Sequence, residues 1–129
     1  MIGVARVGDV SNAEGDRQSD GEWVPAVAKK GAATVFCEGH PVLVLGSPFF
    51  KQKKEKDEPV MDKDTGMQKE DSEGNPIWTT KVVDSRGDIV VESVSATTVF
   101  AEGTPIAGVG DSLTYGLVIA TGSETVFIN

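Results

Sequence analysis

Short apolar runs alternate with turn residues along most of the chain. A β-branched and aromatic run such as Thr34-Val35-Phe36 is followed by a turn of the type Glu-Gly-x-Pro, and Pro41 begins a second apolar run. A run, a tight turn and a returning run are typical of a β-hairpin. The pattern therefore predicts an all-β fold made of short strands joined by tight turns.

Two segments repeat this pattern in register. Residues 31–47 read GAATVFCEGHPVLVLGS and residues 95–111 read SATTVFAEGTPIAGVGD, with eight of seventeen positions identical. The shared positions include both glycines and the proline of the hairpin. Such agreement indicates an internal repeat of one hairpin unit.

A third copy is divided between the two ends of the chain. Residues 122–129 (GSETVFIN) match the front half of the unit, and residues 1–9 (MIGVARVGD) match the back half. Joining the end to the start restores the thirteen-residue length of 99–111 without a gap. Three units whose ring closes where the termini meet predict approximate threefold symmetry within one chain.

Alternation within the strands separates two sets of side chains. One face takes the valines and the other takes the phenylalanines that follow them. We expect one set to meet near the pseudo-axis and the other to pack under the connecting loops, so that both are core. On that basis Phe100→Ala would cost about 3–5 kcal/mol. The two sets are Val35, Val99 and Val126, and Phe36, Phe100 and Phe127.

The connections between the repeats are unequal. An insertion of about 48–76 contains the run 51–74, in which fourteen of 24 residues are charged. Such a run buries too little apolar surface to order itself, so we expect a flexible loop. The segment 77–94 reads as a further hairpin, with strands at 77–83 and 89–91 around the turn 84–87. The whole chain, 1–129, is expected to form a single domain.

Composition and charge narrow the function. The formal net charge is −8, which argues against a nucleic-acid partner. The first residues lack the pattern of a signal peptide, and no run is long enough for a membrane span, so we expect synthesis in the cytoplasm. One cysteine excludes an internal disulfide framework.

The three units resemble those of PAAR-repeat proteins, at 5–9, 34–46, 98–111 and 122–129. The resemblance implies a small conical domain whose broad base docks, one copy per trimer, on a trimeric β-helical spike. It also implies a place at the tip of a contractile tail or injection particle, exported or part of a virion, with transient contact with the target membrane and, in some members, effector cargo. The residues of the repeat framework that would form the docking base are Val4, Val7, Val35, Phe36, Val99, Phe100, Val126 and Phe127.

Members of this family commonly bind a tip metal through several His and a Cys in the loops after Gly-Asp. Here those loops contain neither residue, and the weak candidates are Cys37 and His40. A structural zinc site takes four ligands. We therefore expect no metal or other cofactor.

Two other functions compete with the spike tip. The block Gly110-Asp111-Ser112-Leu113 matches the nucleophile block of GDSL-type esterases, but no histidine follows Ser112 to act as its base. We expect no catalytic residue and no enzymatic activity. The second alternative is a free-standing β-rich binding or adhesin module that uses the insertion.

Overall fold

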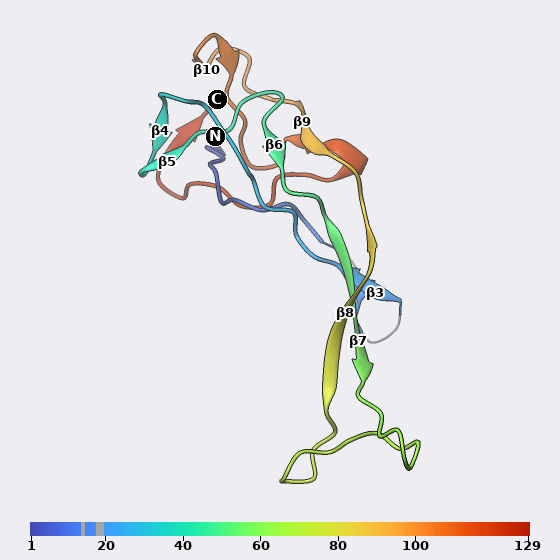
Figure 1. Cartoon of the computed structure of the whole chain (residues 1–129). Coiled ribbons are helices and arrows are strands. Elements are labelled where there is room, and N and C mark those ends of the chain that lie inside the picture. Colours follow the sequence, from blue (N-terminus) through green and yellow to red (C-terminus); the bar gives the residue numbers. More distant parts are fainter. Residues whose placement is uncertain (14, 18–19) are drawn as a thin grey trace. The chain divides into compact units, whose positions relative to one another are not determined.

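The computed structural model describes residues 1–13, 15–17 and 20–129. The regular structure of these residues consists of short β-strands and a single 3-10 turn (Figure 1). The chain divides into two compact units. The core unit is formed by Met1–Asn12, Pro25–Gln52 and Arg86–Asn129, and the inserted unit by Ala13–Val24 and Lys53–Ser85. The predicted all-β class is confirmed.

The core unit contains three equivalent two-stranded hairpins, one from each predicted repeat. The first pairs β4 (Phe36–Cys37) with β5 (His40–Pro41), and the second pairs β10 (Phe100–Ala101) with β11 (Thr104–Pro105). The third pairs β13 (Phe127–Ile128) with β1 (Ile2–Gly3), so it joins the two ends of the chain. The register places Phe127 opposite Gly3, as Phe36 and Phe100 stand opposite the prolines of their own hairpins. The two ends of the chain therefore form the third repeat together, as predicted.

A closed ring of backbone hydrogen bonds marks the pseudo-threefold axis. The amide of Ala5 donates to the carbonyl of Ala107 (3.1 Å), that of Ala107 to Leu43 (2.9 Å), and that of Leu43 to Ala5 (2.9 Å). These three residues hold the same position in the three repeats, and each is 0% exposed. The repeats therefore meet at one point and each bonds to both of the others.

Each repeat ends in the same turn, at 6–9, 44–47 and 108–111. The amide of the fourth residue donates to the carbonyl of the first at 2.9–3.1 Å. The side-chain oxygen of the fourth residue in turn accepts the amide of the first at 2.7–2.9 Å. The third residue is glycine with a φ of +87° to +97°, as a type II turn requires. This geometry explains the Gly-Asp or Gly-Ser pair that closes every unit.

Two apolar layers lie along the axis of the core unit. The first packs around the hairpins and contains the equivalent residues Val4, Val42 and Ile106. The second contains Leu43 with Ala5 and Ala107 and is covered by a three-stranded sheet. That sheet has the order β12 (Ser112–Leu113), β9 (Ile89–Ser93), β6 (Pro48–Phe49).

Among the described residues, the one helical element is the 3-10 turn η1 (Thr114–Gly116), so no helix is long and apolar enough to cross a membrane. The inserted unit is a four-stranded antiparallel sheet in the order β2 (Gly15–Asp16), β3 (Gly21–Trp23), β7 (Lys53–Pro59), β8 (Trp78–Ser85).

This sheet corrects two expectations about the insertion. Residues 53–59, expected to be flexible, form β7 and pair with β8 over seven register positions. The hairpin expected for 77–94 is not formed, because β8 pairs with β7 while β9 pairs with β6 and β12. The strands at 77–83 and 89–91 exist, but they belong to different sheets.

Because the three repeats form a closed ring, we expect the chain to fold with its ends moved to the equivalent turn of another repeat. Joining Asn129 directly to residue 1 with Met1→Gly completes an Asn-Gly loop, which suits a two-residue hairpin turn. Opening the chain between Glu102 and Gly103 then restores the original number of free ends. We expect this permutant to fold with a free energy of unfolding within about 1 kcal/mol of the parent, because one short loop replaces another.

Urea unfolding followed by circular dichroism measures the difference. A permutant opened between Leu43 and Val44 is the matched control, since it cuts the axial ring, and it should not fold. Equal stability of both permutants would contradict the closed ring.

Candidate docking surface

The three phenylalanines of the repeats are exposed, contrary to the expectation that they belong to the core. Their exposed fractions are 57% for Phe36, 54% for Phe100 and 44% for Phe127. The neighbouring residues Cys37, Ala101 and Ile128 are buried. Because successive side chains of a strand point to opposite faces, burial of these neighbours turns every phenylalanine outward.

The valines divide differently from the phenylalanines. Val35 and Val99 are partly buried against the hairpin layer of the core, whereas Val126 is exposed. Val4 is 3% exposed and packs inside the same layer, so it supports the hairpins and cannot touch a partner. Both sets were expected to belong to the core, but the phenylalanines and Val126 are exposed.

Each exposed phenylalanine has an apolar residue from the neighbouring repeat beside its hairpin. The amide of Val109 donates to the carbonyl of Gly3, the register partner of Phe127 (2.9 Å). The equivalent bonds join Val7 to Pro41 (2.9 Å) and Leu45 to Pro105 (3.0 Å). We call the resulting set the threefold apolar surface: Phe36 with Val7, Phe100 with Leu45, and Phe127 with Val109.

Leu45 and Val109 were not among the residues predicted from sequence. They are 40% and 36% exposed, and they occupy the repeat position of Val7, which was among them. The repeat alignment therefore contained the signal that identifies both.

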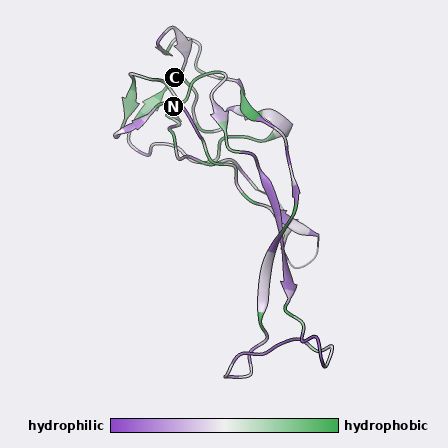
Figure 2. Cartoon of the chain, viewed as in Figure 1, coloured by the Kyte–Doolittle hydropathy of each residue, from purple (hydrophilic) through white to green (hydrophobic). Residues whose placement is uncertain are grey.

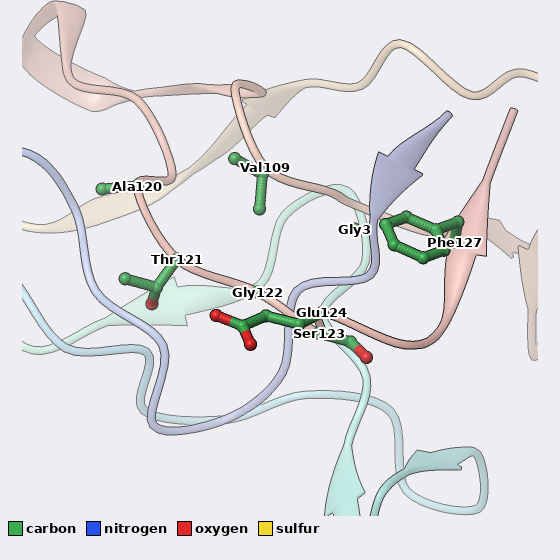
Figure 3. A pocket seen from close by; sticks show the side chains of 8 residues that line it. All are labelled: Gly3, Val109, Ala120, Thr121, Gly122, Ser123, Glu124 and Phe127. Carbon is green, nitrogen blue, oxygen red and sulfur yellow. The ribbon is translucent and has the colours of Figure 1, made fainter.

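One of the three pairs borders an open groove of about 480 Å³ (Figure 3). Phe127 and Val109 line it together with Gly3 and the segment 120–124. The other two hairpins have a proline where this one has Gly3. The threefold apolar surface is thus regular in its backbone and less regular in its side chains.

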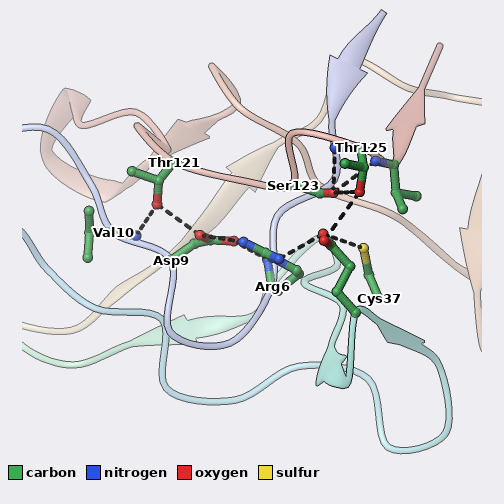
Figure 4. A network of polar contacts seen from close by, with 9 residues as sticks. Arg6, Asp9, Val10, Cys37, Thr121, Ser123 and Thr125 are labelled. Carbon is green, nitrogen blue, oxygen red and sulfur yellow. Dashed lines mark hydrogen bonds and ion pairs between the residues drawn. The ribbon is translucent and has the colours of Figure 1, made fainter.

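Carboxylates in the hairpin turns connect neighbouring repeats. Glu102 accepts the amide of Ala33 (2.8 Å) and the hydroxyl of Thr34 (3.0 Å). Glu38 accepts a guanidinium N–H of Arg6 (2.9 Å) and the hydroxyl of Thr125 (3.2 Å) (Figure 4). Both glutamates adopt a positive φ, of 53° and 52°, which is uncommon for a residue with a Cβ. The bonds they make across the repeats give a reason for glutamate at this strained position.

The surroundings of Glu38 favour its charged form. Hydrogen bonding from Ser123, then from Thr125, and the positive charge of Arg6 lower the pKa of the Glu38 carboxyl. A lowered pKa in the folded protein means that Glu38 stabilises the fold above the usual glutamate range, about 4.3. This contribution is lost as the pH falls through the lowered pKa.

Glu38→Gln should therefore reduce stability at neutral pH by more than it does at low pH. We expect the difference in free energy of unfolding between parent and variant to be constant near pH 7 and to vanish below the lowered pKa of Glu38. Thermal unfolding from pH 2 to pH 7 measures it. Glu124→Gln is the matched control, since Glu124 is exposed and bonds to no other described residue, and its difference should be small throughout. A constant effect of Glu38→Gln down to pH 2 would show that its charge is irrelevant.

The residues present do not fit the tip metal of the PAAR family. Cys37 is 5% exposed in an apolar cluster, where its equivalents are Ala101 and Ile128, and His40 is exposed. In the part of the chain that the structure describes, no group of three or more His, Cys, Asp or Glu side chains could hold a metal ion. Cys37 packs in this cluster, and its thiol donates to Oε1 of Glu38 (3.7 Å).

The esterase-like block has a structural use. The Asp111 carboxylate accepts the amide of Gly108 (2.7 Å) and the amide and hydroxyl of Ser95 (3.0 and 2.7 Å), which fixes the turn. Ser112 is exposed in β12, and no hydrogen bond among the described residues joins its hydroxyl to His40. The Gly-Asp pair before Ser112 is the turn found in the other two repeats.

Comparison with protein-family models and with curated proteins gives no match for this chain.

Proposed function

We propose that this protein caps the end of a trimeric partner, as the tip of a spike in a contractile injection particle. The threefold apolar surface is the observation that carries this proposal. Three phenylalanines, each 44–57% exposed, are repeated around one axis of a single chain. Exposed aromatic residues in a symmetric set are costly in water unless a partner covers them.

Symmetry selects the kind of partner. A monomer with pseudo-threefold symmetry can present the same contact to each subunit of a true trimer. A trimeric partner can cover all three phenylalanines with one contact used three times. The resemblance to PAAR-repeat proteins, whose base sits on a trimeric β-helical spike, supports the same partner.

The chemistry of the surface suits tight and specific docking. Aromatic residues dominate the binding energy of protein interfaces when they enter pockets. The adjacent aliphatic residues Leu45 and Val109 extend the apolar contact at two of the positions, whereas Val7 is partly buried against the second layer of the core. The role is mechanical, since the cap transmits force from the spike to the target envelope and needs no catalytic group.

Co-expression with a trimeric β-helical spike protein encoded in the same gene cluster, followed by native mass measurement, tests the proposal. We expect one copy of this chain per spike trimer. A stable homotrimer of this chain alone, or one copy bound to each spike protomer, would contradict it.

A further inference from the structure

Among the residues whose burial the structure describes, the inserted unit forms no hydrophobic core of its own. Both apolar clusters lie in the core unit, and Gly21 is the one buried residue among those of the inserted unit whose burial the structure describes. Figure 2 shows that β7 is strongly hydrophilic. A small sheet needs a buried apolar face or a further packed element to be stable in water.

Strand β8 is the uncovered edge of this sheet. It is last in the strand order, and all eight of its residues are exposed. The exposed residues include Trp78 (48%), Val82 (51%) and Val83 (42%). An edge this long, with β-branched and aromatic residues and no proline, is a template for pairing with another strand.

The two faces of β8 differ in chemistry. On one face Lys81 stands directly opposite Lys56. Like charges in this position destabilise a strand pair. Neither lysine forms an ion pair with another described residue, although Glu58 shares this face.

The other face of β8 is apolar along its outer side. Alternation places Trp78, Thr80 and Val82 there. Their register partners on β7 are Pro59, Asp57 and Glu55, so the carboxylates lie on the inner side. A strand added at the free edge of β8 would lie next to Trp78 and Val82 rather than next to the carboxylates of β7.

We propose that β8 binds an extended strand of a partner protein in which acidic and apolar residues alternate. An acidic residue opposite Lys81 relieves the repulsion between Lys81 and Lys56, and apolar residues opposite Thr80 and Val82 cover Trp78. The added strand satisfies the free backbone groups of the edge, as in β-strand addition. Lys81 thus excludes basic and wholly apolar strands and admits an acidic one.

This inference does not depend on docking through the core unit. The binding probe is an acetylated and amidated octapeptide of alternating valine and glutamate. Titration into the full chain carrying Trp23→Phe follows the fluorescence of Trp78 alone. We expect saturable binding with a blue shift, because the added strand removes Trp78 from water.

Two control peptides separate the two parts of the proposal. A peptide of alternating valine and lysine should bind at least about tenfold more weakly, and Lys81→Glu should reverse that preference. A valine–glutamate peptide N-methylated at alternate residues keeps its side chains but cannot complete the ladder, so it should not bind.

Three results would overturn the proposal. They are no binding of the valine–glutamate peptide, equal binding of the two charge types, and undiminished binding of the N-methylated peptide. Sedimentation of the protein alone gives a fourth: a dimer dissociated by the valine–glutamate peptide would identify a second copy of this chain as the occupant of the edge.

Discussion

Replacing Leu43 by alanine should lower the free energy of unfolding by about 3 kcal/mol. Leu43 is 0% exposed, and its backbone bonds to both other repeats at the axis. Its equivalents there are the small residues Ala5 and Ala107, so Leu43 supplies most of the apolar volume at this level. Removing it leaves a cavity that three bonded backbones cannot close.

Urea unfolding of Leu45→Ala provides the matched control. Leu45 is two residues further along the chain but is 40% exposed in a type II turn. Its replacement should change the free energy of unfolding by no more than about 0.5 kcal/mol. Similar losses for both variants would show that Leu43 is not at a packed axis.

Replacing Phe36, Phe100 and Phe127 together by serine should abolish binding to the trimeric spike while the chain remains folded. Each single replacement by alanine should weaken binding by about 30-fold, as for an aromatic residue that enters a pocket. All three side chains are about half exposed, so their loss should change stability by less than about 1 kcal/mol. Biolayer interferometry on immobilised spike, with thermal unfolding in parallel, separates the two effects.

Phe50 offers a matched control for this set. It is 54% exposed, as Phe100 is, but it lies outside the threefold apolar surface and under the ammonium group of Lys29 (5.6 Å). Phe50→Ala should bind the spike normally. Binding reduced by Phe50→Ala and unaffected by Phe100→Ala would place the interface elsewhere.

The closed ring of repeats could be predicted because its signal is local and repeated three times. A glycine at the third turn position and an Asp or Ser after it recur in each unit, and each has a visible role in the turn. The two halves of the divided repeat match in length, so their pairing followed from the sequence alone. The predicted strand positions were less accurate. The strand expected at 34–36 is Phe36–Cys37, and the strand expected to start at Pro41 is His40–Pro41, so both are two residues long and lie directly beside the turn.

The buried face of the hairpins could not be predicted from alternation alone. Period two separates valine from phenylalanine but does not say which face meets the axis. The small residue after Phe100, Ala101, was the better guide, because a crowded centre admits small side chains. Aromatic residues were expected to be core, whereas the centre of the repeats is filled by Ala5, Leu43 and Ala107.

The inserted sheet was missed because its pairing is not local in sequence. β7 is highly charged, and composition alone predicts disorder for it. In the structure the Arg17 guanidinium donates to the carboxylate of Glu22 on β3 (3.2 Å) and lies 3.7 Å from the carboxylate of Glu55 on β7. An opposite charge from a segment far away in the sequence thus helps to order β7, although the composition of β7 alone predicts disorder.

Fluorine NMR of the chain labelled with 4-fluorophenylalanine tests docking on a trimer most directly. The chain has five phenylalanines, and Phe49 is buried while Phe50 is exposed outside the threefold apolar surface. On titration with the spike, the resonances of Phe36, Phe100 and Phe127 should shift together and saturate at one chain per three spike protomers. Saturation at one chain per protomer, or shifts confined to Phe50, would contradict a cap that docks through its threefold surface.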